Sequence, residues 1–279
     1  MASRRAPESA SRTADRAQVL RVGSYNIHRC VGGDGRCDPE RVAQVIREIN
    51  CDPLGLQEVD NSPGATPTSR QLDYLARATG MSGVAGLRII RHLGHYGNAL
   101  LTRRRVMDVR RHDLSFSWRE PRGALDVDLE IAGLATRIIV THLGLTPGER
   151  RHQMLRILSI VGDGHGAQPV VLLGDVNEWL PLGRPLRWLH ALFGRPPAVR
   201  SFPAALPLLA LDRIWVRPRA ALLSVSAHRS AAARLASDHL PVTAELALSP
   251  VSGSSTTRLS TTHCSASGLM FTNPTESGG

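Results

Sequence analysis

The stretch PVVLLGDVN, residues 169–177, is an apolar run that ends in polar residues. Its four consecutive aliphatic side chains predict a buried β-strand. Gly174, Asp175 and Asn177 follow, and these residue types also favour a plain turn. Because alternate residues of an extended chain point to the same side, we expect Asp175 and Asn177 to face one site.

The same arrangement recurs in both directions along the chain. Other apolar strand-like segments carry a polar residue at or just beyond one end: Asn26, Glu58, His142, Asp212, Asp238 and His239. Loops at strand ends are where rigid scaffolds place functional groups. A charged group beside a buried run also needs a partner, because burying it alone costs several kcal/mol. The sequence therefore predicts that these side chains meet in one polar site.

The segments between residues 18 and 248 alternate between strand and helix patterns. Predicted strands are residues 18–27, 53–59, 96–102, 106–114, 124–131, 136–143, 169–177, 211–216, 221–228 and 238–246. One helix begins after Asp38, which we expect to cap it, and a second begins at 146–149 with an apolar face of Met154, Leu155, Leu158 and Val161. Many strands with few helices predict an α/β sandwich of packed sheets with helices outside.

Composition sets the outer limits of the interpretation. We expect residues 1–17 and the Ser/Thr-rich residues 249–279 to be disordered, which leaves one domain over residues 18–248. No signal peptide or transmembrane segment is readable, since the best apolar run, 201–211, is short and contains two prolines. The four cysteines form no CxxC pair. Reduced thiols in a cytoplasmic protein are the plain interpretation.

The net charge of +10 favours a nucleic acid or an anionic surface as a partner. The chain contains no lysine, however, so all 34 basic residues are arginine. Such a complete bias is also typical of genome-wide composition. The charge alone therefore leaves both interpretations open.

The donor set of the predicted polar site indicates its chemistry. Carboxylate and amide oxygens without cysteine select a hard cation such as Mg²⁺, with Mn²⁺ as an alternative. Histidines beside such an ion move protons near neutral pH. The combination favours metal-assisted hydrolysis of a phosphoester.

Seven motifs occur in a fixed order over residues 20–247: SYNIH, LQEVD, HYGNALLT, THLGL, GDVNEW, LDRIWV and SDHLPV. Together they resemble the endonuclease/exonuclease/phosphatase superfamily, and details such as EPRGAL resemble its small bacterial YbhP-like branch. The resemblance implies a four-layer α/β/β/α sandwich of the DNase I-like kind, with two mostly antiparallel sheets packed together. It also implies a metal-dependent phosphoric ester hydrolase with one catalytic cleft at the strand ends.

The resemblance assigns roles to individual residues. Glu58 matches the principal metal ligand, and Asn26 and Asp238 match positions that assist the metal site. Asp175 matches the residue that orients or deprotonates the attacking water, and Asn177 matches a group that positions water and stabilises the transition state.

The histidines complete the catalytic set that the resemblance implies. His239 matches the histidine that contacts the phosphoryl oxygen or serves as acid or base, and Asp212 matches the carboxylate that orients it. His142 matches a second histidine, whose carboxylate partner in DNase I-like enzymes has Asn98 as its nearest counterpart here. An asparagine orients an imidazole but does not stabilise its cation as a carboxylate does.

Further candidates surround this set. Arg122 suits a phosphate because its planar fork binds oxyanions in pairs, and His28 and Tyr96 are candidates for substrate contact, with Asn98 beside them. Trp179 is interpreted as core packing.

The first functional interpretation is a phosphodiesterase that acts on a small or lipid-derived phosphodiester, as a monomer. The alternative is a nuclease that cleaves DNA or RNA. A lipid substrate would bring transient contact with a membrane surface and exposed apolar residues at the cleft rim, for which ALPLL at 205–209 is a candidate. A third hypothesis, a non-catalytic binding protein with this fold, is disfavoured because nearly every expected catalytic position is filled.

Overall fold

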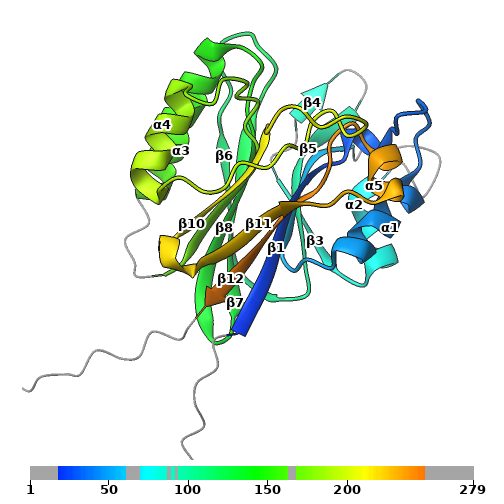
Figure 1. The fold of residues 1–279 in the computed structure, drawn as a ribbon, viewed down its shortest axis with the longest axis horizontal. Coiled ribbons are helices and arrows are strands. Elements are labelled where there is room, and N and C mark those ends of the chain that lie inside the picture. Colours follow the sequence, from blue (N-terminus) through cyan, green and yellow to red (C-terminus); the bar gives the residue numbers. More distant parts are fainter. Residues whose placement is uncertain (1–17, 61–69, 87–88, 92–93, 163–167, 249–279) are drawn as a thin grey trace, which may run out of the picture.

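The computed structural model describes residues 18–248 apart from 61–69, 87–88, 92–93 and 163–167. The two ends predicted to be disordered, 1–17 and 249–279, lie outside the described residues. The described chain forms two β-sheets packed face to face, with helices on both outer sides (Figure 1). The predicted four-layer sandwich is therefore confirmed.

The first sheet holds seven of the described strands, and in it β1 runs parallel to β2 while the other pairs are antiparallel. Their order is β11 (Leu222–Ala227), β12 (Val242–Leu248), β1 (Gln18–Asn26), β2 (Leu54–Asp60), β5 (Gly94–Thr102) and β3 (Ser82–Ala85), with β4 (Ile89–Arg91) also paired to β5.

The second sheet holds five strands, and only β8 and β9 are parallel. Their order is β10 (Asp212–Arg217), β9 (Val170–Asp175), β8 (Leu134–His142), β7 (Gly123–Ile131) and β6 (Arg105–Asp113). Strand β9 is buried along its whole length, as its uninterrupted apolar run predicts.

The helices cover the two outer faces. Figure 1 shows α1 (Pro39–Ile49), α2 (Gln71–Thr79) and α5 (Ala231–Ala236) on one side and α3 (Pro147–Gly162) and α4 (Arg184–Phe193) on the other. Short 3-10 helices, η1 (His28–Cys30) and η3 (Arg219–Ala221), follow β1 and β10. In the described part of the chain, no helix combines the length and the apolar character needed to cross a bilayer.

Three layers of apolar side chains lie between these four layers. One packs α1, α2 and α5 against the first sheet, and another packs α3 and α4 against the second. The layer between the sheets includes Leu100, Val140 and Leu173, all fully buried. Gly55 of β2 lets the sheets approach closely, because a Cβ there would lie 2.2 Å from Leu173 Cδ1.

The two predicted helices form, with one correction. Asp38 caps α1 as expected, since its carboxylate accepts hydrogen bonds from the backbone of Glu40 and Arg41. In α3, however, Leu155 is exposed and the buried face is turned toward Gln153 and Ile157. Ile157 and Ile160 pack on this face with Met154 and Val161 at helical spacing, and the buried Gln153 side chain accepts a hydrogen bond from the Gly144 backbone there.

Candidate functional site

Strand pairing brings the predicted polar residues to one end of the two sheets, called the site end below. His142 and Asp212 both lie beside Asp175 in the register of the second sheet, and Asn26 lies beside Gln57, next to Glu58, in the first. In Figure 1 this end lies at the top of the view, opposite the ends of the described chain. The packing of the two sheets then joins the two groups.

Asp175 is the centre of the site. Asn26 connects the sheets, because its Nδ2 donates both to Asp175 Oδ2 and to Glu58 Oε1, each at a distance of 3.1 Å. The Asn177 backbone N–H donates to Asp175 Oδ1 at a distance of 2.9 Å. Both carboxylate oxygens of Asp175 are therefore held in fixed directions by neutral donors.

Unusual backbone conformations aim these side chains. Gly174 has a φ of +147°, and a Cβ there would lie 1.9 Å from the Thr141 carbonyl oxygen, so only glycine fits before Asp175. Asn177 has a φ of +48°, so the expected extended backbone is wrong: a tight turn onto Asp175 brings the two side chains together. Glu58 has a φ of +57° at a bulge in β2, which re-aims its side chain.

The environment of Asp175 tunes its acidity. Burial raises the pKa of Asp175 to about 6, and the charge of Asp212 adds to that rise, although His239 and the hydrogen bonds oppose it. A carboxylate with this pKa is ionised at neutral pH and is still basic enough to take up a proton. This is the property of a general base that works near neutral pH.

His239 is held as a cation by its partners. Its Nδ1 lies 2.8 Å from Asp212 Oδ2, and its Nε2 lies 3.7 Å from Asp175 Oδ2. Burial opposes the charge, but Asp212 and Asp175 outweigh it and raise the pKa of His239 to about 10. Ser201 also donates to Asp212 Oδ2, and the Phe202 ring lies 4.7 Å from the imidazole between centroids.

His142 has the opposite character. Burial, Arg122 and His239 hold the pKa of His142 well below its ordinary value, so its ring is neutral. Both ring nitrogens face a donor, Arg122 Nη1 at 3.0 Å from Nδ1 and Asn177 Nδ2 at 3.1 Å from Nε2, and a neutral ring accepts at only one of them. A guanidinium only donates, so Nδ1 accepts and Nε2 carries the proton, while Asn177 Nδ2 donates to the Leu143 carbonyl. Nε2 lies 3.6 Å from Asp175 Oδ2.

The expected pairing of His142 with Asn98 is wrong. The Asn98 side chain donates instead to the Gly123 carbonyl, at a distance of 2.8 Å. Arg122 takes the place beside the ring because β7 begins next to the end of β8, where Ala124 pairs with Thr141. Burial is the main reason that the ring is neutral, and Arg122 adds to it because a guanidinium cannot stabilise an imidazolium.

Two groups of side chains could hold a metal ion. The predicted set begins with Glu58, which is partly buried and, within the described residues, receives one hydrogen bond and makes no ion pair. Asp238 is 41% exposed, with Oδ1 3.7 Å from His28 Nδ1. Asn26 presents its amide nitrogen to Glu58, because its oxygen accepts from the His28 backbone. Hard oxygen donors without a cationic partner fit a divalent cation.

The second group is Asp175, Asp212 and His239, whose donor atoms lie within 4.8 Å of one another. Here the short bond between Asp212 Oδ2 and His239 Nδ1 already uses one donor atom from each residue. Asp212 Oδ1 is buried without a hydrogen-bond partner among the described residues. The raised pKa of His239 favours a proton at this pair, so Glu58 fits a metal better.

The remaining predicted contacts divide between the site and its surroundings. Arg122 is buried and donates to Glu120 as well as lying beside His142. His28 follows Asn26, with Nδ1 3.1 Å from the Val31 carbonyl. The backbone of Tyr96 pairs with Asp60, and its side chain lies outside the described part. Ser201 is a site residue that sequence reasoning missed, although it opens the segment that leads to Asp212.

The expectation that Trp179 packs in the core is wrong, because this residue is 55% exposed.

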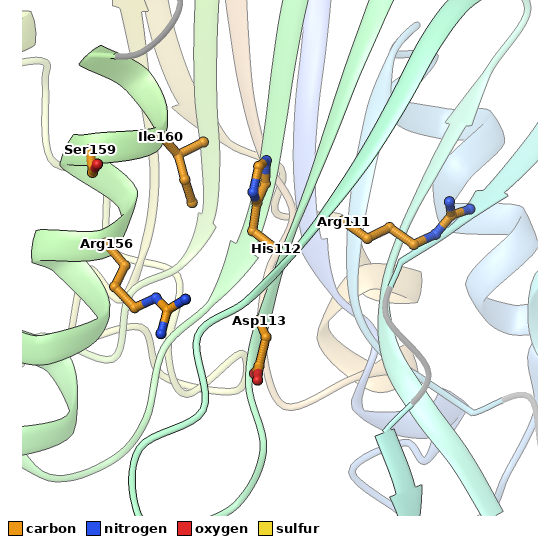
Figure 2. Close-up of a pocket in the computed structure, with 6 residues that line it drawn as sticks. All are labelled: Arg111, His112, Asp113, Arg156, Ser159 and Ile160. Carbon is orange, nitrogen blue, oxygen red and sulfur yellow. The ribbon is translucent and has the colours of Figure 1, made fainter.

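A separate cavity of about 310 Å³ lies between β6 and α3 and is lined by Arg111, His112, Asp113, Arg156, Ser159 and Ile160 (Figure 2). Figure 2 shows Arg111 pointing away from the other five residues. His112 belongs to the buried Asp126 ion-pair network on this outer face, so the cavity is distinct from the Asp175 site.

Comparisons with known proteins agree with this geometry. The model of the Endonuclease/Exonuclease/phosphatase family matches residues 23–239. The uncharacterized protein YbhP of Escherichia coli (strain K12) is 30% identical over 248 residues, covering 82% of this chain and 96% of that protein.

Solved structures show the same fold. An endonuclease/exonuclease/phosphatase from Beutenbergia cavernae DSM 12333 has a TM-score of 0.65 at 24% identity, covering 83% of this chain and 72% of that one. The Bacteroides thetaiotaomicron VPI-5482 mannosyl-6-phosphatase Bt3783 has a TM-score of 0.66 at 18% identity, covering 82% of this chain and 100% of that one.

Proposed function

The chain belongs to the endonuclease/exonuclease/phosphatase family, and from that premise we propose that it is a Mg²⁺-dependent phosphodiesterase that uses direct attack by water. Its substrate is a small or lipid-derived phosphodiester. One observation carries the proposal: the buried Asp175 carboxylate, with its raised pKa, lies between a neutral histidine and a cationic one.

Glu58 would hold the cation, assisted by Asp238 and by Asn26, which orients the Glu58 carboxylate. When bound, Mg²⁺, or Mn²⁺ in its place, supplies positive charge that neutralises a phosphate oxygen and the departing alkoxide. The unpaired, partly buried Glu58 carboxylate supports this placement among the described residues.

Asp175 orients a water molecule and removes its proton. The hydrogen bonds from Asn26 and Asn177 fix the direction of both carboxylate oxygens, so the water attacks along one line. The water oxygen forms a bond to phosphorus, the bond to the leaving alkoxide breaks, and the water proton goes to Asp175. No covalent enzyme intermediate is needed.

The histidines bind the charge that develops on the phosphoryl oxygens. His239 donates from Nε2 as an imidazolium, with Asp212 holding its other nitrogen. His142 donates from Nε2 as a neutral ring, with Arg122 fixing that tautomer. Asn177 adds a donor beside His142. Preorganised donors of this kind are often the largest single contribution to catalysis.

His28, Tyr96 and Asn98 remain proposed substrate contacts. For Arg122, first proposed as a substrate contact, we propose a role through His142 instead, because it is buried and donates to that ring. His28 lies beside the proposed metal site through its 3.7 Å approach to Asp238.

The alternative function is cleavage of DNA or RNA, which the net charge of +10 favours. The run Arg103–Arg105 gives it little support. The Arg103 guanidinium donates to the Thr79 carbonyl, Arg104 pairs with Asp52, and Arg105 pairs with Glu130. These arginines therefore already have partners within the protein.

The test measures hydrolysis of bis-p-nitrophenyl phosphate and of the monoester p-nitrophenyl phosphate with Mg²⁺, Mn²⁺ or EDTA. Wild type is expected to cleave the diester faster than the monoester, only with metal, and Asp175→Ala to lose at least about a hundredfold in rate. Diester cleavage that survives in EDTA or in Asp175→Ala would overturn the proposal. Faster cleavage of the monoester would make the protein a phosphatase.

A further inference from the structure

A set of exposed apolar side chains lies in loops at the same end of the second sheet as Asp175. Each is more than half exposed, from 55% to 81%, which is unusual for leucine and tryptophan: Trp118, Leu145, Trp179, Leu180, Leu182, Leu206 and Leu208. We call these seven residues the apolar rim. The catalytic residues of the proposed mechanism are not among them.

Strand register places the whole rim at the site end. Trp118 lies in the loop between β6 and β7, which meet there through the pair Asp113 and Gly123. Leu145 follows the end of β8, and Trp179, Leu180 and Leu182 follow the end of β9. Leu206 and Leu208 precede the start of β10, on the loop whose Ala204 backbone bonds Asp238.

Hydrogen bonds and a buried ion pair fix the backbone of the loops that carry Leu145, Trp179, Leu180 and Leu182. The buried Glu178 carboxylate accepts from Arg150 and from the Leu180 backbone, and Arg150 also donates to the Leu145 carbonyl. The Gly183 backbone donates to the Leu180 carbonyl, which closes the turn that carries Leu180 and Leu182. A buried ion pair is costly unless its geometry is well satisfied. Here it fixes a loop whose apolar residues face solvent.

The exposed charges around the rim are mostly positive. Arg119, Arg151 and Arg184 are exposed in the same loops and first helical turns. Of the acidic residues there, Glu149 and Glu178 are buried and Glu120 pairs with Arg122, while Asp113 at the end of β6 is exposed. The Arg119 guanidinium lies 4.4 Å from the centre of the Trp118 ring. Apolar side chains interspersed with arginine complement an interface that is apolar below and anionic at its surface.

The residue composition of the apolar rim favours a membrane surface over a nucleic acid or a second copy of the chain. Leucines offer no stacking surface for bases and no hydrogen bond for a phosphate, so five leucines around two tryptophans fit a nucleic acid poorly. A second copy docked rim to rim would bring like charges together. In a membrane, tryptophan and arginine lie at the headgroup level while leucine enters the acyl region.

We propose that the apolar rim docks the site end onto an anionic phospholipid surface, so that lipid phosphodiesters reach Asp175 from the bilayer. The identity of the substrate rests on the proposed phosphodiesterase function, whereas docking itself does not. The loops that carry the rim all adjoin strands of the second sheet at the end where Asp175 lies, so docking brings the headgroup layer against that end.

The experiment measures co-sedimentation with vesicles of phosphatidylcholine alone and of phosphatidylcholine mixed with phosphatidylglycerol, without added metal. Wild type is expected to bind the anionic vesicles more tightly, with a blue shift of tryptophan fluorescence. Leu180→Ser with Leu182→Ser is expected to weaken binding roughly tenfold. The matched control is Leu155→Ser with Leu223→Ser, two leucines each 55% exposed and outside the rim, which is expected to bind as wild type.

Each alternative result overturns the proposal. Equal binding by the rim and control variants, or no binding by wild type, removes the docking surface. Stronger binding to a single-stranded oligonucleotide than to vesicles identifies a nucleic-acid surface. A wild type that forms dimers, with a rim variant that is monomeric, identifies a second copy of the chain as the occupant. All proteins are also assayed on bis-p-nitrophenyl phosphate. A wild type that hydrolyses this diester but does not bind vesicles refutes docking alone, whereas an inactive wild type that binds vesicles refutes only the proposed function.

Discussion

In this site, the charge state of a side chain is determined by its neighbours as well as by its residue type. Two histidines lie within 3.7 Å of the same Asp175 oxygen, yet one is cationic and the other neutral. The difference is the partner on the second ring nitrogen, which is Asp212 for His239 and Arg122 for His142. Paired groups whose pKa values are pushed apart are typical of acid–base catalysis.

The pH dependence of hydrolysis follows from these pKa values. The mechanism needs Asp175 ionised and His239 protonated, so kcat/KM should fall by about tenfold per pH unit below about 6 and again above about 10. In Asp212→Asn, His239 loses the charge that raises its pKa, so the upper limb should move to lower pH. A pH–rate profile of both proteins measures this, and an upper limb that stays in place would contradict the assignment.

The identities of the site residues could be predicted from the sequence, but some of their contacts could not. Asp175, Asn26 and His239 come together as their places at strand ends indicate. The Arg122 contact with His142 depends on the pairing of β7 with β8, and the Asn26 amide orientation depends on the His28 backbone. Both are tertiary facts that residue order does not contain.

At the scale of elements, periodicity identified the long strands and the two helices with clear caps. It missed α4, although Leu186, Leu189 and Phe193 form its buried face, because the preceding segment PLGRP indicates a loop. It also missed α2, whose buried face includes Leu72 and Leu75, and α5, which has six residues and is too short to show a period. The buried face of α3 was misplaced because the sequence offers two apolar sets at helical spacing, and Ile157 and Ile160 are buried in place of Leu155 and Leu158.

Close approach of the two sheets at Gly55 gives an element-scale prediction. A Cβ there would meet Leu173 Cδ1 at 2.2 Å and Val140 Cγ1 at 3.0 Å. Gly55→Ala should therefore lower the free energy of unfolding by about 1–3 kcal/mol, measured by urea denaturation. The control is Gly148→Ala in α3, where a Cβ meets nothing within 4 Å. A Gly55→Ala protein as stable as that control would show that the sheets pack less closely.

At the scale of the molecule, the three apolar layers are built from residues 20–248. The long-range pairs that join the first strand to the last, such as Gln18 with Leu248, close the first sheet. Every contact that assembles the site also lies inside this range, including the bond between Asn26 and Asp175. We therefore propose that residues 18–248 form the complete catalytic domain.

A chain trimmed to residues 18–248 should keep the Tm of the full chain and its diester hydrolysis. The physical reason is that the apolar layers and the site contacts all remain. Thermal unfolding followed by circular dichroism, with the hydrolysis assay beside it, measures both properties. A Tm lowered by several degrees would show that residues 1–17 or 249–279 stabilise the fold.

The central claim is that Glu58 holds the metal while Asp175 and the Asp212–His239 pair handle protons. The most direct test is the dependence of bis-p-nitrophenyl phosphate hydrolysis on Mg²⁺ concentration in wild type, Glu58→Gln and Asp212→Asn. Glu58→Gln should raise the half-saturating Mg²⁺ concentration at least about tenfold, whereas Asp212→Asn should lower the maximal rate and leave that concentration nearly unchanged. Wild-type Mg²⁺ dependence in Glu58→Gln, with the shift appearing in Asp212→Asn, would place the metal among Asp175, Asp212 and His239 and contradict the account.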